Sequence, residues 1–429
     1  MAVPNVLFGR MHDPAAHTIE RYLATDGYAA LRRAVHDMTP EQVLAEVQAS
    51  GLTGRSGGSA FTTAQKWGLL ADERPAYVVV NGDESEPGTF KDRQLLERDP
   101  HQLLEGALLC AYAVGADCVI VYVRGESALA YDRVRDALAD ARRHGAVGDH
   151  ILGSAFSCEA IAHRGAGAYV VGEETALLSS LEGERGMPRV RPPYPAAQGL
   201  YAQPTIVNNV ETLSTVPWIV RNGGAAFAAL GGARSTGTRV FSVSGRVRRP
   251  GNYEIELHHT TFRDLIFDPE LGGGIVGDRA FTAFFPGASF PWLWPEHLDL
   301  RLDIDDVAAA GSSLASGLVV LDDTVCPIRV AARLVRFFAE ESCGKCTPCR
   351  EGAPWLEKIM YRIVHGYGRL EDLALLEDVG KRMGPGTTIC ALGPSTVSPI
   401  SSTLTRFRDH YLAHVSVGAC PLEAPARAA

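Results

Sequence analysis

Four cysteines restrict the fold of this chain more than any other feature of its sequence. Cys343, Cys346 and Cys349 are spaced C-x2-C-x2-C in ESCGKCTPCREG, and Cys390 stands alone in TTICALG. Three thiolates on one tight loop can reach three corners of a cubane cluster, and a distant loop can supply the fourth. The spacing therefore predicts that the carboxyl-terminal part of the chain folds around a 4Fe-4S cluster.

A structural zinc site is the main alternative for these four thiols, and unligated thiols are a third interpretation. Four-cysteine zinc sites usually take two ligands from each of two C-x2-C knuckles, so three ligands from one loop favour iron. Of the other five cysteines, Cys110, Cys118 and Cys158 stand in apolar segments and are expected to be small core residues. The sequence assigns no role to Cys326 and Cys420.

The first two hundred or so residues alternate helical and strand patterns. Unbroken runs of Val, Ile and Tyr predict strands at Tyr77 to Gly82 and at Cys118 to Glu126, and Thr39 followed by Pro40 predicts a helix start. Strands of this kind, separated by helices, are typical of a parallel sheet covered on both faces. We therefore predict an α/β fold with the outline of a nucleotide-binding domain.

The pattern changes twice in the rest of the 429-residue chain. Short alternating segments follow Arg239, with a turn at Pro250 and Gly251, and they predict a small β-rich domain. Four amphipathic segments follow Val325 and predict a four-helix bundle. We divide the chain into residues 1–235, 236–324 and 325–429.

Composition and charge exclude several classes of protein. Hydrophobic residues make up 46% of the chain and charged residues 21%, as in ordinary globular proteins. The net charge of −9 and the lack of long basic runs argue against nucleic acid as a partner. The chain lacks a signal-peptide pattern at its start, and Glu105 and Asp117 interrupt its most apolar stretch, so we expect a cytoplasmic protein without direct membrane insertion.

Two glycine-rich loops and one acidic segment carry the remaining signals. GRSGGSAF and RGAGAYVVGEETALL offer backbone amides that can approach a phosphate, although a flexible loop and plain helix capping explain them equally well. NGDESEPGTFKDR follows the first predicted strand directly, where segments line the binding crevice of a parallel sheet. Its carboxylates could form a solvated turn or an ion site, and facing a ribose they would favour NAD over NADP.

Taken in order, the motifs resemble one known family over almost the full chain. SGLTGRSGGSAF, NGDESEPGTFKDR, GAGAYVVGEETALLSSLEG, PTIVNNVETL and SCGKCTPCREG with TICALG are similar to the flavin-carrying NADH-dehydrogenase subunit of respiratory complex I. The same motifs mark the diaphorase subunits of NAD-linked hydrogenases and formate dehydrogenases. The resemblance implies an FMN-binding α/β domain, a ubiquitin-like β-grasp domain of the SLBB type, and a helical bundle that holds the cluster.

The resemblance also implies a reaction and a set of site residues. Hydride would pass from NADH to FMN without a catalytic side chain, and single electrons would pass to the cluster at Cys343, Cys346, Cys349 and Cys390. Phe61 and Tyr194 would stack on NADH, with Glu86, Glu174 and Arg191 nearby. FMN would be held by Gly54, Arg55, Gly57, Gly58, Lys66, Asn81, Asp83, Glu84, Tyr169, Gly172, Glu173, Asn208, Asn209 and Thr212.

Departures from the family's usual pattern keep other functions open. The first loop has Ala60, Thr62 and Ala64 at positions where glycine, proline and glycine are usual, and SFPWLWPE (residues 289–296) is also unusual. The alternatives are a diaphorase subunit of a soluble hydrogenase or formate dehydrogenase, and a cluster-bearing scaffold without NADH activity. A separate thioredoxin-like 2Fe-2S subunit or another iron-sulfur subunit is the expected partner, and any membrane association would come through such partners.

Overall fold

The computed structural model describes residues 5–57 and 61–422. Its first sheet contains four parallel strands in the order β3-β2-β1-β4. The strands are β1 (Tyr77–Gly82), β2 (Cys118–Val123), β3 (Glu159–Arg164) and β4 (Thr205–Asn209). The parallel α/β architecture expected for the amino-terminal part is confirmed, with β2 ending at Val123 rather than at Glu126.

Helices cover both faces of this sheet. The first twelve are α1 (Ile19–Leu23), α2 (Ala29–Asp37), α3 (Pro40–Ala49), α4 (Thr63–Trp67), α5 (Lys91–Arg98), α6 (Pro100–Val114), α7 (Ala128–Arg143), α8 (Glu174–Leu181), α9 (Pro195–Gln198), α10 (Val210–Asn222), α11 (Gly224–Ala228) and α12 (Phe262–Phe267). One face packs on α6, α7 and α10 through Val78, Val80 and Val119. The other face packs on α8 through Val79, Ile120 and Val207. Side chains from alternate positions therefore fill two separate cores, as unbroken apolar strands require.

The second sheet is mixed and has the strand order β6-β5-β8-β7. Its strands are β5 (Thr238–Gly245), β6 (Gly251–Glu256), β7 (Phe281–Phe285) and β8 (Gly317–Asp322), and α13 (Ile304–Ala309) precedes the last of them. β5 pairs antiparallel with β6 and parallel with β8, while β7 pairs antiparallel with β8. The predicted turn at Pro250 and Gly251 lies between β5 and β6.

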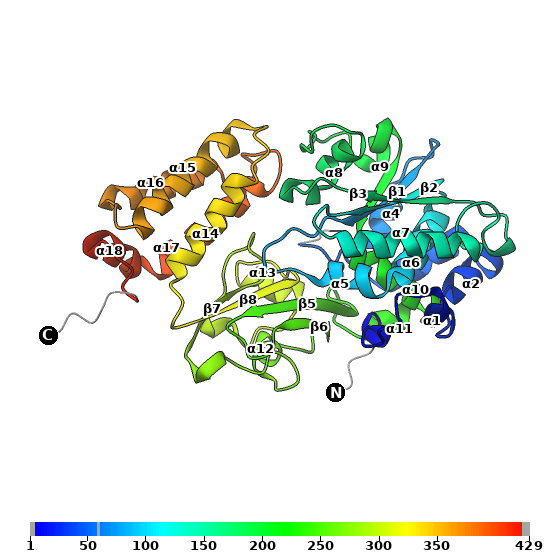
Figure 1. Ribbon diagram of the computed structural model, residues 1–429, viewed down its shortest axis with the longest axis horizontal. Helices are drawn as coiled ribbons and strands as arrows, with labels where there is room; N and C mark the ends of the chain where they lie inside the picture. Colours follow the sequence, from blue (N-terminus) through cyan, green and yellow to red (C-terminus); the bar gives the residue numbers. More distant parts are fainter. Residues whose placement is uncertain (1–4, 58–60, 423–429) are drawn as a thin grey trace.

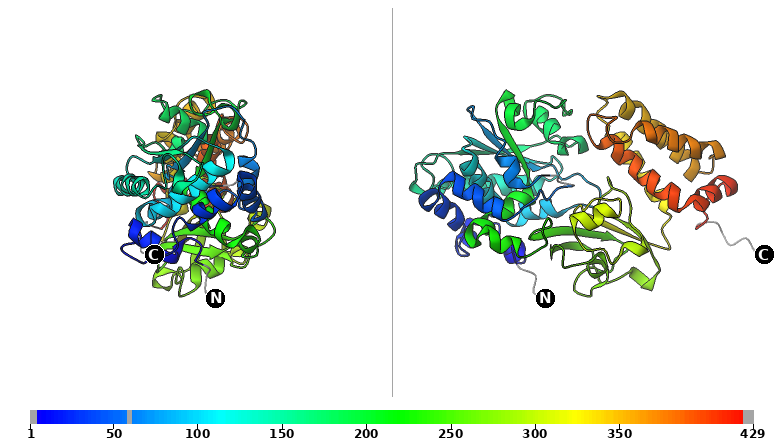
Figure 2. Two further views of the ribbon diagram at one scale, coloured as in Figure 1. Left: turned by 90° about the vertical axis from the view of Figure 1, so that its right-hand side faces the viewer. Right: turned by 180° about the vertical axis from the view of Figure 1, so that it is seen from behind.

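The carboxyl-terminal part is helical, as expected. It contains α14 (Pro327–Glu340), α15 (Thr347–Val364), α16 (Leu370–Arg382), α17 (Leu392–Arg406) and α18 (Arg408–Val417). The fourth predicted segment is divided at Phe407, which ends α17 and precedes α18. Figures 1 and 2 show these helices at one end of the long axis and the first sheet at the other, with the second sheet between and below them.

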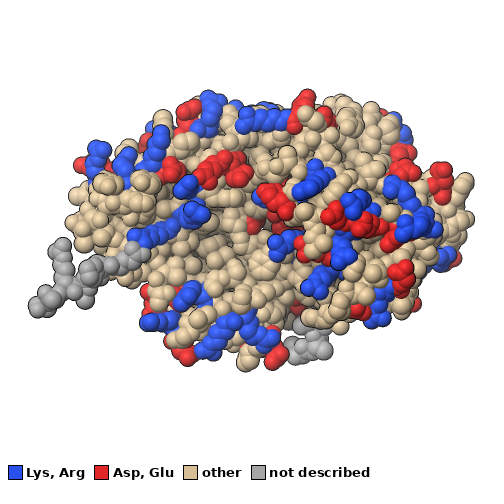
Figure 3. Space-filling model, viewed as in Figure 1, with Lys and Arg blue, Asp and Glu red and all other residues tan. Residues whose placement is uncertain are grey.

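Two further features bear on the classes considered above. On the face drawn in Figure 3, basic and acidic side chains alternate over most of the surface. Within residues 5–57 and 61–422, no helix is both long enough and apolar enough to cross a membrane.

Candidate functional site

A cavity of about 330 Å³ opens beyond the carboxyl end of β1. All three parts of the chain contribute to its wall: the loop after β1, residues 289, 290, 315 and 316 from the second sheet's surroundings, and the segment from Cys390 into α17. The predicted site residues that line it are Gly57, Asn81, Asp83, Glu84, Glu86, Tyr169, Gly172, Glu173 and Asn209. The structure therefore brings together residues that are spread over more than 150 positions of the sequence.

The segment after β1 is fixed by hydrogen bonds of Asn81. Its side-chain amide donates to the Gly172 carbonyl oxygen at 2.9 Å, and its Oδ1 accepts from the Asp83 amide at 3.1 Å. The carboxyl of Asp83 is buried, and burial raises its pKa to about 7. Asp83 Oδ1 has no hydrogen-bond partner among the described residues, so this buried acceptor is free to bind a donor from a ligand.

Glu84 serves the architecture of the site as a helix cap. It accepts hydrogen bonds from the amides of Asp92 at 2.8 Å and Arg93 at 2.9 Å, at the start of α5. Burial, and then the nearby Asp92, raise its pKa to about 7. The buried ammonium of Lys91 lies 2.7 Å from Asp92 and 2.8 Å from Glu211, so a cation beneath the cavity balances part of this negative charge.

Glu86 joins the first and second sheets at the cavity. It accepts from the Tyr169 hydroxyl at 2.8 Å and from both the amide (2.7 Å) and the hydroxyl (2.8 Å) of Ser289. Burial raises the pKa of Glu86 above its usual value. Ser289 and its neighbour Phe290 were not predicted as site residues, although the unusual SFPWLWPE segment that contains them was the available signal.

The same segment also reaches the helical bundle. Trp292 stacks on Phe285 with ring centroids 5.1 Å apart, and its amide donates to the Ser402 hydroxyl at 3.0 Å. Trp294 packs against Phe407, and the Arg406 guanidinium lies 5.5 Å from the Trp294 ring centroid. The tryptophans therefore hold the Ser289 loop between the cavity and α17.

Several predicted residues form a group outside the cavity lining. Glu174 pairs with Lys66 at 2.7 Å and with Arg191 at 3.0 Å, and the Arg191 guanidinium lies 5.9 Å from the Tyr194 ring centroid. The Phe61 side chain is 62% exposed and Tyr194 is 60% exposed, which leaves two aromatic rings accessible to a ligand.

Glu173, which lines the cavity, caps α8. Its side chain accepts from the amides of Thr175 and Ala176, both at 3.0 Å. Helix α8 therefore begins at Glu174, one residue before the expected Thr175. The capping role that the sequence left open for this loop is real, and it places Glu173 at the wall of the cavity.

Four predicted residues support the site from behind. The buried Arg55 side chain points away from the cavity and donates to the carbonyl oxygens of Thr236 at 2.7 Å and Thr238 at 3.1 Å. Thr212 accepts from the Arg55 amide at 2.8 Å, and Asn208 accepts from the Trp67 indole at 2.8 Å. Gly54 precedes this pair and does not line the cavity. Gly58, the last predicted residue of the loop, lies outside the described residues.

The four predicted cluster cysteines gather on the second core of the first sheet. Cys343, Cys346, Cys349 and Cys390 all pack against the apolar group that includes Val79, Ile120 and Leu178. Burial raises the pKa of the Cys390 thiol to about 11, and neighbouring Cys343 and Cys349 contribute to that rise. Four thiols from two segments in an apolar setting fit the donor set of an iron-sulfur cluster. Cys390 also lines the cavity, so the two sites share a wall.

Comparisons with known proteins point in the same direction. Residues 47–218 match the Nuo51 FMN-binding domain, and residues 329–414 match the NADH-ubiquinone oxidoreductase-F iron-sulfur binding region. The NADH-quinone oxidoreductase F subunit 2 of Rhizobium meliloti (strain 1021) is 46% identical over 97% of this chain and 99% of that protein. The NADH-quinone oxidoreductase F subunit of Mycobacterium tuberculosis (strain ATCC 25618 / H37Rv) is 46% identical over 96% of this chain and 93% of that protein.

Solved structures of an NAD+-reducing [NiFe]-hydrogenase are also similar. In the air-oxidized state, one chain is 36% identical with a TM-score of 0.81, covering 93% of this chain and 67% of that chain. In the H2-reduced state, the identity is 36% and the TM-score 0.78, with 92% of this chain and 66% of that chain covered. The present chain thus spans about two thirds of the hydrogenase chain that it resembles.

Proposed function

This chain belongs to the family of NADH-quinone oxidoreductase F subunits, and on that premise we propose that it oxidises NADH through FMN and a 4Fe-4S cluster. One observation carries the assignment of the two sites: Cys390, the remote cluster ligand, lines the same cavity as the residues expected to hold FMN. A cluster at the four cysteines would therefore lie directly beside the flavin, with no further carrier between them.

The residues of the cavity fit FMN. Its glycines, Gly57 and Gly172, allow close approach of a planar ring, while Asn81, Asp83 and Asn209 offer polar atoms to a hydroxylated chain. When bound, FMN would supply the conversion from hydride transfer to one-electron transfer. The protein's share of the work is to bind and orient the two nucleotides and to exclude water, so no side chain need act as a general acid or base.

NADH would approach from the exposed aromatic group. We propose that Phe61 and Tyr194 stack on its rings, because both are large, accessible side chains beside the charged group of Lys66, Glu174 and Arg191. Glu86 would stay at the inner end of the path, held by Tyr169 and Ser289.

An anaerobic NADH titration of the purified protein tests the function. We expect stoichiometric bleaching of the flavin absorbance, followed by a reduced-cluster signal in low-temperature EPR. Iron and flavin that remain oxidised in excess NADH would contradict the proposal and favour a scaffold without NADH activity.

The acceptor beyond the cluster lies on another chain in this proposal. The family membership favours a quinone-reducing complex, and the similarity to an NAD+-reducing hydrogenase supports a diaphorase role as the second candidate. We propose a separate 2Fe-2S subunit of the thioredoxin-like type as the direct partner, with membrane association only through partner subunits. Co-purification of tagged protein from its native host, followed by iron-sulfur and nickel analysis of the captured complex, distinguishes the two roles.

A further inference from the structure

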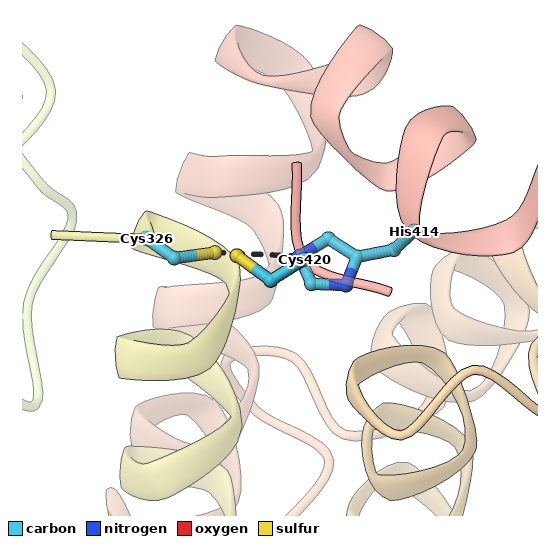
Figure 4. Close-up of side chains that lie close together, drawn as sticks. All are labelled: Cys326, His414 and Cys420. Atoms are coloured by element: carbon cyan, nitrogen blue, oxygen red, sulfur yellow. Dashed lines mark hydrogen bonds between the residues drawn. The ribbon is translucent and has the colours of Figure 1, made fainter. Parts of the chain in front are cut away.

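A second group of metal-binding side chains lies in the helical bundle, away from the four cluster cysteines. Cys326 stands at the start of α14, His414 lies in α18, and Cys420 follows that helix. All three are buried, with exposed fractions of 7%, 0% and 1%. Figure 4 shows the two sulfur atoms and the imidazole ring directed toward one another.

The geometry of this group suits a single metal ion. Cys326 Sγ lies 3.3 Å from His414 Nε2, and one ligand atom from each of the three residues lies within 4.8 Å of the other two. Ligands at about 2.0 to 2.3 Å from a tetrahedral ion are separated by distances of this order. A cubane cluster needs a fourth thiolate, which is not present in this group, so the two cysteine sites differ in kind.

We propose that Cys326, His414 and Cys420 bind one zinc ion that is separate from the iron-sulfur cluster. Two thiolates and a neutral imidazole together balance the charge of Zn²⁺, which lowers the cost of burying the ion. Backbone N–H groups of Ile328 and Arg329, in the first turn of α14, also hydrogen-bond to the Cys326 sulfur and favour its thiolate.

A cavity gives the ion a route to this site. It has a volume of about 430 Å³ and is lined by Cys326 and Cys420 together with Arg329 and Arg333. A water from this cavity can complete a four-coordinate site with three protein ligands. The bound ion would tie the turn after α18 to the start of α14, and so close the bundle at the end opposite the cluster loop.

Metal analysis and zinc-edge X-ray absorption of the full-length holoprotein test the proposal. The protein is produced with both iron and zinc in the medium and then passed through a chelating resin. We expect about one zinc per chain beside a fully occupied cluster, with two sulfur neighbours at about 2.3 Å and one nitrogen at about 2.0 Å. Because absorption at the zinc edge is specific to that element, iron and flavin do not obscure it.

Variants place the zinc. Cys326→Ser and Cys420→Ser should each lower zinc content at least tenfold without changing iron content, while Cys158→Ser, which alters another buried cysteine, should keep both metals. Less than about 0.1 zinc per chain in wild type, a Cys326–Cys420 disulfide in the intact-mass spectrum, or a coordination shell of four sulfurs would overturn the proposal. The wild-type spectrum decides the question even where a serine variant fails to fold.

Discussion

The carboxyl group of Asp83 is a residue whose protonation should report on the filling of the cavity. Burial raises its pKa to about 7, and Oδ1 lacks a hydrogen-bond partner among the described residues. A hydroxyl group of FMN that donates to this oxygen would stabilise the carboxylate and lower the pKa. We therefore expect FMN binding to the apoprotein at pH 6 to release up to about 0.9 proton from Asp83, and binding at pH 8.5 to release none.

Calorimetry in two buffers of different ionisation enthalpy measures this proton release. Asp83→Asn keeps the shape of the side chain and removes the titrating group, so the variant should release fewer protons than wild type at pH 6 and the same number at pH 8.5. The FMN phosphate titrates equally in both proteins and cancels in the difference. Equal proton counts at pH 6 would show that FMN does not bind against Asp83.

Lys91 is a buried cation on which the polar floor of the cavity depends. It is 1% exposed and pairs with Asp92 and Glu211, which are themselves buried. Lys91→Met leaves two carboxylates without a cation, and we expect a loss of about 3 to 5 kcal/mol of stability at pH 8. The loss should shrink as the pH falls, because the unpaired carboxyls then take up protons.

Urea unfolding of the two proteins at pH 8 and pH 5 measures this effect. Lys358→Met changes an exposed lysine and should leave the unfolding midpoint near that of wild type at both pH values. A Lys91→Met variant as stable as wild type at pH 8 would mean that the carboxyls accommodate one another without the ammonium.

Single residues also show where sequence patterns stop being informative about the site. The acidic segment after β1 was predicted to face the crevice, and Asp83, Glu84 and Glu86 do line the cavity. Ser289 could not be predicted, because its hydrogen bonds to Glu86 join positions 203 residues apart. Arg55 sits in the expected glycine loop, yet its side chain turns toward Thr236 and Thr238, since those carbonyl oxygens satisfy a buried guanidinium.

At the scale of elements, the contact between α6 and α10 behind the first sheet depends on Gly106. A β-carbon at that position would overlap the carbonyl oxygen of Leu213 on α10, so the two helices can approach closely only without it. Gly106→Ala should therefore lower stability by about 2 kcal/mol or more, although alanine is the better helix former by about 1 kcal/mol.

Side-by-side thermal melts at one scan rate test this contact. We expect the apparent Tm of Gly106→Ala to fall by at least about 4 °C. Gly384→Ala is the matched control, because its β-carbon would meet its nearest neighbour at 3.6 Å, an ordinary contact distance. An unchanged or higher Tm for Gly106→Ala would show that the helices separate at little cost.

Elements also differ in how well local sequence determines them. The start of α3 was predicted from Thr39 and Pro40, and the structure has a capping box there, since capping depends on neighbouring residues alone. The break between α17 and α18 was not predicted, because the periodicity of residues 401–415 continues through Phe407. Phe407 packs against Trp294, so a contact with the second sheet's loop accompanies the break in the helix.

For the whole molecule, the cavity is the place where three separately predicted parts meet. Glycine and acidic segments beside the first sheet, Ser289 and Phe290 from the second, and Cys390 with Leu392 from the bundle all line it. The sequence indicated each part and its chemistry, but not how they pack, because the contacts that join them are long-range and side-chain specific. The boundaries 1–235, 236–324 and 325–429 remain predictions.

This arrangement makes flavin reduction separable from cluster reduction. Cys343 is an expected cluster ligand that does not line the cavity, unlike Cys390. Cys343→Ala should therefore abolish the reduced-cluster EPR signal, while FMN stays bound and NADH still bleaches it. Turnover with ferricyanide, a small acceptor that can take electrons at the flavin, should stay within about twofold of wild type, a change below about 0.5 kcal/mol in the barrier.

The matched control for this prediction is Cys118→Ala, which alters a half-buried thiol packed against the same apolar group. It should keep FMN, the EPR signal and ferricyanide turnover. If Cys343→Ala loses FMN together with the cluster, then the cluster holds the bundle against the cavity and the two cofactor sites are one folding unit. If FMN and its reduction persist, the flavin site is complete without the cluster, and Cys390 serves it only as part of the shared wall.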